Sequence, residues 1–129
     1  MDILSSTCQE ILKKNRFKMK LHSSYRFVDE KTRDSFYKLE KGDDSERELF
    51  KLLKQALTNI EENAFSGVQV PKKLMPKKYI EKYEIKNLWK YNLPKGWRLL
   101  YSIMSDEIIV ISLILEWCDH NEYERRFKY

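Results

Sequence analysis

The chain has 129 residues and a net charge of +5, with 42% hydrophobic, 13% aromatic and 35% charged residues. This length suits one compact core, and the aromatic content argues against a disordered chain. The longest apolar run, 108–115, is far shorter than the ~20 residues that cross a bilayer, so we expect a soluble, globular protein. The N-terminus shows no secretory signal pattern, which makes the cytoplasm the expected location.

The positive charge is concentrated in one segment. Residues 71–98 contain nine lysine or arginine and two glutamate side chains, a net charge of +7 that exceeds that of the whole chain. Tyrosine and tryptophan residues alternate with these cations. Cations neutralise phosphates and aromatic rings stack on bases, so the segment favours a polyanionic partner such as RNA; a solvated lysine-rich surface is the alternative.

Residues 1–22 are expected to form an N-terminal extension, with Thr7-x-x-Glu10 as a possible capping box of a short helix. Residues 23–129 are expected to form a single domain. Cys8 and Cys118 lie 110 positions apart, which matches neither a metal-binding nor a redox spacing. Both cysteines are therefore interpreted as structural, and no metal or other cofactor is expected.

A short strand is predicted over 25–28, followed by two helices. Asp29 is expected to cap a first helix that runs to about Lys41, and Ser45-x-x-Glu48 is interpreted as the capping box of a second helix. Apolar residues recur in the second helix at helical spacing between Leu49 and Ile60. The short connection between the helices predicts an antiparallel helical hairpin whose apolar faces need a sheet as cover.

The remaining chain is predicted to be mostly extended. Residues 66–80 have no sustained period and are interpreted as a long basic connection, followed by strands over about 85–93, 97–104 and 107–115 and a charged short helix or tail. The fold class is therefore α+β, in the order β-α-α-β-β-β, with an antiparallel-dominated four-stranded sheet backed by the helical hairpin.

The second and third of these strands form the most informative feature of the chain. Pro94-Lys95-Gly96 separates two aromatic runs, which predicts a β-hairpin with a type I turn and Gly96 in the left-handed position that follows. If Leu93 faces Trp97, Trp89 and Tyr91 lie on one face, and Lys90, Asn92 and Arg98 lie on the other. Cations on a rigid sheet are suited to binding phosphate.

With this hairpin, the chain resembles the RelE/ParE superfamily of toxin-antitoxin toxins over about residues 24–127. The resemblance rests on the element order, on Leu-Trp-Lys-Tyr-x-Leu followed by Gly-Trp-Arg-Leu-Leu-Tyr, on the apolar last strand and on His120-x-x-Tyr123. It implies a type II toxin of the RelE branch, a metal-independent endoribonuclease that cleaves ribosome-bound mRNA and inhibits translation. The implied partners are an antitoxin protein, the ribosome and mRNA, with no membrane.

The resemblance also implies roles for four residues. Arg98 would bind the phosphate or the transition state, and Lys90 would bind phosphate or assist proton transfer. His120 would act as general base, and Tyr123 would stack on or orient the base. Other residues of the same surface are expected to contact RNA: Lys86, Asn92, Lys95, Arg125 and Arg126.

The chain departs from the RelE pattern at two places. Asn92 replaces the second lysine of the strand, and the arginine usual after the last strand is not evident in 116–119. The ParE branch has the same fold without this catalytic set, so a non-catalytic binding module, topoisomerase-inhibitor-like or a decayed toxin, is the alternative function. Arg98 also has a purely structural alternative, an ion pair with Asp119 or Glu122.

Overall fold

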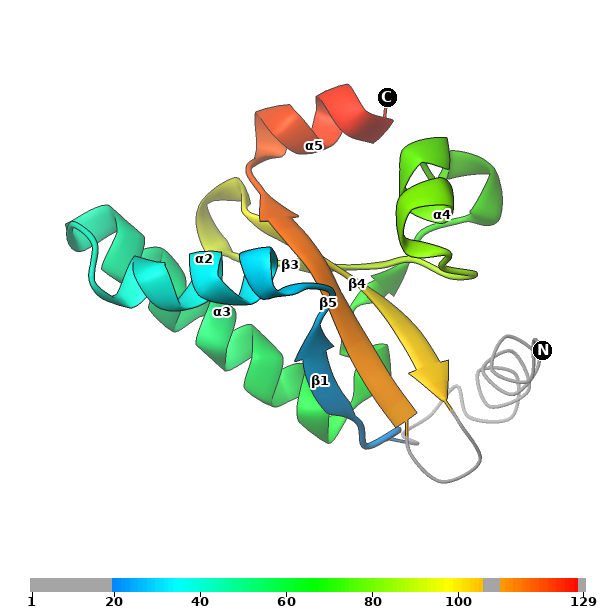
Figure 1. The fold of residues 1–129 in the computed structure, drawn as a ribbon, viewed down its shortest axis with the longest axis horizontal. Helices are drawn as coiled ribbons and strands as arrows, with labels where there is room; N and C mark the ends of the chain where they lie inside the picture. The colour runs from blue at the N-terminus through cyan, green and yellow to red at the C-terminus, as the bar shows by residue number, and fades with distance from the viewer. Residues whose placement is uncertain (1–19, 106–109, 128–129) are drawn as a thin grey trace.

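The computed structural model describes residues 20–105 and 110–127, which form an α+β fold around one mixed sheet (Figure 1). The strands lie in the order β1-β5-β4-β3-β2. Strand β1 runs parallel to β5, and the other neighbouring pairs are antiparallel. Helices α2 and α3 cover one face of the sheet, and α4 and α5 lie over the other (Figure 1). The predicted extension, 1–22, lies almost entirely outside the described residues.

The strands are β1 (Ser24–Phe27), β2 (Val68–Gln69), β3 (Trp89–Asn92), β4 (Arg98–Ser105) and β5 (Val110–Cys118). The helices are α2 (Glu30–Glu40), α3 (Asp44–Glu62), α4 (Lys77–Tyr83) and α5 (His120–Phe127). None of these helices is both long and apolar enough to cross a membrane.

The helical hairpin is confirmed, with one change at its second cap. Asp29 caps α2 by accepting a hydrogen bond of 2.7 Å from the Thr32 N–H. The capping box of α3 is formed by Asp43 and Glu46 rather than by Ser45 and Glu48. Both pairs fit the same sequence pattern, and the helix begins at the earlier one.

The sheet has five strands where four were expected. The additional strand, β2, is only two residues long, and it pairs with the start of β3 at the sheet edge. The region 66–80 is also more structured than the predicted surface connection, because it contains β2 and leads into α4. Met75 and Tyr79 are buried against the second face of the sheet, which anchors this region.

The predicted register of the β3–β4 hairpin is confirmed. Lys90 pairs with Leu100 and Asn92 with Arg98, and the Leu93 N–H donates to the Trp97 carbonyl at 2.9 Å. The turn differs from the predicted type I geometry, because Lys95 as well as Gly96 has a positive φ, 63° and 82°. A positive φ is uncommon for residues other than glycine, so the pairing of β3 with β4 on both sides of the turn holds Lys95 in this conformation.

Two cores result from this register. The core beneath α2 and α3 contains Trp89 and Tyr101 of the hairpin, together with the apolar faces of both helices. The core beneath α4 and α5 contains Leu100, Leu115, Cys118, Tyr123 and Phe127. Burial raises the pKa of the Cys118 thiol to about 11, so this cysteine stays a neutral core side chain at physiological pH.

A buried asparagine continues the sheet below β3. Asn87 donates to the Ile103 carbonyl at 2.8 Å and accepts from the Ile103 N–H at 2.8 Å. Its Oδ1 also accepts from the Ser102 hydroxyl at 3.2 Å. The Asn87 side-chain amide therefore forms the two hydrogen bonds with Ile103 that a backbone residue of a longer β3 would otherwise form. It also fixes the chain just before β3, the strand that carries Lys90.

Replacing Asn87 by alanine is expected to destabilise the fold. The change leaves the buried N–H and C=O of Ile103 without partners, at a cost of about 2–4 kcal/mol. Urea unfolding measures this difference, and Asn121→Ala, at an exposed position of α5, is the matched control. An Asn87→Ala midpoint equal to that of the control would contradict the role of Asn87.

Candidate functional site

The hairpin presents its polar residues on the face that α5 covers. Lys90, Asn92 and Arg98 point to this face, while Trp89 and Tyr91 point into the core beneath α2 and α3. Lys90 and Arg98 are half-buried and Asn92 is exposed. The strand pairing thus brings two cations together on a rigid base.

Both cations lie against the ring of Tyr123 in α5. The distance to the ring centroid is 5.1 Å from Lys90 Nζ and 5.8 Å from Arg98 Cζ. These distances fit cation–π contacts, which attract a cation without neutralising it as a carboxylate would. Tyr123 is 3% exposed, so its ring faces the cations and not the solvent.

The structural alternative for Arg98 is not found. Asp119 accepts a hydrogen bond from the Glu122 N–H at 2.9 Å and so caps α5, while the Glu122 carboxylate binds Arg126. Arg98 donates one hydrogen bond, to the Trp97 carbonyl at 3.2 Å, and its buried Nε has no hydrogen-bond partner. Within the described ranges, neither Lys90 nor Arg98 has an ion-pair partner.

His120 lies at the start of α5, beside the hairpin turn. A Cβ added to Gly96 would lie 3.3 Å from His120 Cβ, and Arg98 pairs with Cys118, two residues before the histidine. His120 Nε2 lies 3.0 Å from Glu124 Oε1, and 55% of the side chain is exposed. Glu124 can therefore orient the imidazole, and about half of the His120 side chain stays exposed.

The predicted RNA-contacting residues separate into two groups. Lys95 forms an ion pair with Glu48 of α3 at 2.6 Å, and Arg126 binds both Glu116 and Glu122, so their charges are compensated. The other three are exposed: Lys86 and Arg125, which have no ion-pair partner within the described residues, and the uncharged Asn92.

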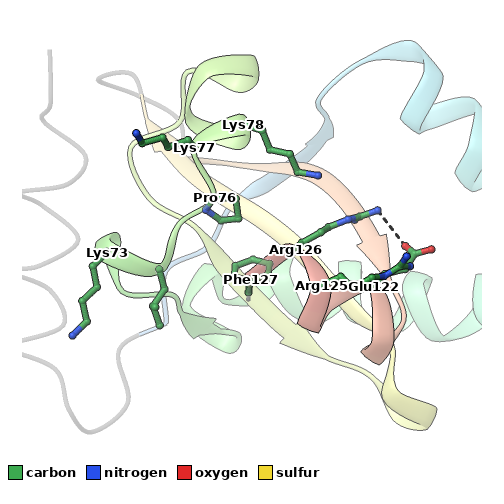
Figure 2. A pocket seen from close by; sticks show the side chains of 9 residues that line it. Lys73, Pro76, Lys77, Lys78, Glu122, Arg125, Arg126 and Phe127 are labelled. Carbon is green, nitrogen blue, oxygen red and sulfur yellow. Dashed lines mark hydrogen bonds and ion pairs between the residues drawn. The ribbon is translucent and has the colours of Figure 1, made fainter. Parts of the chain in front are cut away.

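A basic cleft of about 720 Å³ opens between the α4 region and α5 (Figure 2). One wall carries Lys73, Lys77 and Lys78, and the other carries Arg125 and Arg126. The three lysines belong to the basic segment noted in the sequence but were not predicted as site residues. Their place became visible only with α4, which has no recognisable period in the sequence.

Glu116 of β5 lies beside this cleft under Arg126. Its Oε1 is 2.5 Å from Arg126 Nη1, and 24% of its side chain is exposed. Burial raises the pKa of the Glu116 carboxyl, and the positive charges of Arg126 and Lys78 only partly offset this effect. The Glu116 side chain therefore lies in a partly buried position that disfavours its ionised form.

No group of three or more histidine, cysteine, aspartate or glutamate residues suited to a metal ion occurs in the described part of the chain. Comparisons of the chain with protein-family models, with curated proteins and with solved structures give no match. What this surface binds is therefore inferred from its own residues.

Glu116→Gln is expected to remove a pH-dependent loss of stability. The pKa of Glu116 is raised above its ordinary value of 4.5 in the folded state, so the folded protein binds more protons than the unfolded chain in the window above pH 4.5. Stability from this group therefore falls as pH rises through that window. The difference in unfolding free energy, variant minus parent, should grow with pH and then level off.

Urea unfolding at a series of pH values measures this difference. Asp29 and Asp43, whose pKa values are lowered by hydrogen bonds at helix N-termini, contribute the opposite slope, but they are common to both proteins and cancel. Glu40→Gln, an exposed change in α2, is the control for the substitution itself. A difference that does not vary with pH would contradict the raised pKa.

Proposed function

We propose that this chain is a RelE-like toxin of a type II toxin-antitoxin system, a metal-independent endoribonuclease that cleaves ribosome-bound mRNA in the cytoplasm. The observation that carries the proposal is the pair of half-buried, uncompensated cations, Lys90 and Arg98, gathered on the Tyr123 ring beside His120. The succession of a strand, a helical hairpin, three strands of a sheet and a final helix supports it. The added β2 and α4 are departures from the predicted order.

The chemistry requires few groups. The ribose 2′-hydroxyl attacks the adjacent phosphorus, the bond to the 5′-oxygen breaks, and a 2′,3′-cyclic phosphate and a 5′-hydroxyl result. Lys90 and Arg98 would offset the charge that develops on the phosphoryl oxygens. Because these oxygens are anionic already in the substrate, the same cations would also bind the RNA before reaction.

His120 would exchange the proton. Its exposed imidazole, oriented by Glu124, would remove the 2′-proton or protonate the leaving 5′-oxygen. We assign Tyr123 a positioning role, because its buried ring holds both cations and is not open to a base in this arrangement. An antitoxin would then inhibit the protein by covering the same cationic face.

Arg98→Ala is expected to lower the rate of ribosome-dependent mRNA cleavage by about 100-fold or more, the usual effect of removing one charge-stabilising donor. The assay uses purified protein, ribosomes and a defined mRNA, and it tests the products for cyclic phosphate ends. Arg33→Ala, in α2 on the other side of the sheet, is the matched control, and circular dichroism checks the fold of each variant.

Two outcomes would overturn the proposal. If Arg98→Ala cleaves like the parent, the site is wrongly placed. If the folded parent does not cleave mRNA on ribosomes, the non-catalytic binding module is favoured instead. Asn92, in place of the second strand lysine, would then be the leading cause of the missing activity.

His120→Ala is expected to reduce the cleavage rate by about 100-fold while RNA binding is retained, because a proton-transfer group acts in the transition state. His22→Ala, which changes the other histidine of the chain at an exposed position, is the control. Equal activity of the two variants would exclude His120 from the reaction.

The ring of Tyr123 is tested by its conservative variant. Tyr123→Leu removes the cation–π contacts and should weaken RNA binding about tenfold, while Tyr123→Phe keeps the ring and should restore most of the affinity. Fluorescence anisotropy with a labelled RNA measures both. Equal weakening in the two variants would show that the ring does not hold the cations for binding.

A further inference from the structure

The basic cleft between α4 and α5 keeps most of its charge uncompensated. Arg126 is bound to Glu116 of β5. It is also bound to Glu122, which lines the cleft (Figure 2). Four other cations line it, and none has an ion-pair partner among the described residues: Lys73, Lys77, Lys78 and Arg125. All four are exposed, so an anionic ligand reaches them without displacing an internal partner.

A row of aromatic rings connects this cleft to the hairpin cations. Phe127 lines the cleft, and its ring stacks on Tyr123 with centroids 4.2 Å apart. The Tyr123 ring in turn contacts Lys90 and Arg98. Four residues of an α-helix rise by about 6 Å, so the two cationic surfaces are neighbours along α5.

The kind of cation in the cleft indicates the ligand. Lysine ammonium groups act as mobile point charges that suit phosphates without reading a base. They are spread over a cleft of about 720 Å³, which exceeds what one phosphate group needs. A ligand that fits both the spread of charge and the continuity with the hairpin is a flexible polyanion with regularly repeated phosphates.

We propose that this cleft is a second phosphate-binding site, which holds the backbone of the single-stranded RNA whose scissile phosphate lies at Lys90 and Arg98. This inference rests on the proposed function and extends it, because it assigns a role to α4 and to the three lysines of the α4 region. The second site would lengthen the bound RNA segment. The cleft would contribute to the affinity for RNA, and Arg98 and His120 would take part in the cleavage step.

The test compares two lengths of 2′-O-methyl oligouridine, which lacks the attacking hydroxyl and so reports binding alone. The lengths are about 4 and about 16 nucleotides, the range of sites on proteins that bind single strands. The double variant Lys77→Gln/Lys78→Gln is compared with Lys38→Gln/Lys41→Gln. The control removes the same charge from exposed positions at α2, on the other side of the sheet.

We expect the cleft variant to bind the long oligomer about tenfold more weakly than the control does, with the short oligomer affected equally in both. The slope of log affinity against log salt for the long oligomer should fall by about 1.4, or about 0.7 for each lost phosphate contact. A cleft variant that binds the long oligomer like the control overturns the inference.

Two further results distinguish failure of the cleft site from failure of the proposed ribonuclease function. In the first, the cleft variant binds the long oligomer more weakly, but the parent protein does not cleave mRNA on ribosomes. This result supports the RNA-binding cleft and overturns the proposed ribonuclease activity. An oligoglutamate of matched charge that displaces the long oligomer at equal concentration identifies the cleft as a docking site for an acidic protein segment, and it overturns the RNA assignment.

Discussion

The register of the β3–β4 hairpin is the constraint on which the rest of the structure depends. Side chains alternate between the faces of a sheet, so a slip of one residue would exchange them. Trp89 and Tyr101 would then leave the core beneath α2 and α3, and Lys90 would enter it. Burial of these large aromatic rings therefore holds the cations on the opposite face. The Pro94–Gly96 turn enforces the same register locally, with Lys95 and Gly96 both at positive φ.

Helix α5 supplies the remaining side chains of the candidate site on the β3–β4 hairpin. Helix α5 buries Tyr123 and Phe127 against the second face of the sheet and leaves Arg125 exposed. It also decides which charges are neutralised, because Glu122 binds Arg126 and the Tyr123 ring, rather than a carboxylate, faces Lys90 and Arg98. Charge compensation is therefore complete at Arg126 and incomplete at the hairpin, on the same surface.

Local patterns predicted the hairpin register and the helix pair, because turn chemistry and apolar spacing act over a few residues. They did not predict β2 and α4. A two-residue strand shows no alternation, and a seven-residue helix that follows Pro76 shows little period. Strand β2 depends on pairing with β3, and the α4 region depends on burial of Met75 and Tyr79 in a core built from distant parts of the chain. Likewise, His120-x-x-Tyr123 could be noticed in the sequence, but the contact between the Tyr123 ring and two strand cations could not, because it depends on how α5 docks.

The arrangement of charge at the hairpin is costly for stability, and under the proposed function it would favour binding of RNA. A half-buried guanidinium whose Nε has no partner loses hydration that the Tyr123 ring restores only in part. A carboxylate at this place would have stabilised the fold more, and it would have competed with an anionic ligand for the same donors. A phosphate placed between Lys90 and Arg98 would supply a hydrogen-bond acceptor for Arg98 Nε. Part of the free energy lost by desolvating Arg98 in the free protein would then be recovered when the phosphate binds. The same reasoning applies to α5, which places the Tyr123 ring against the hairpin cations and the Glu122 carboxylate against Arg126, a residue that Glu116 of β5 also binds.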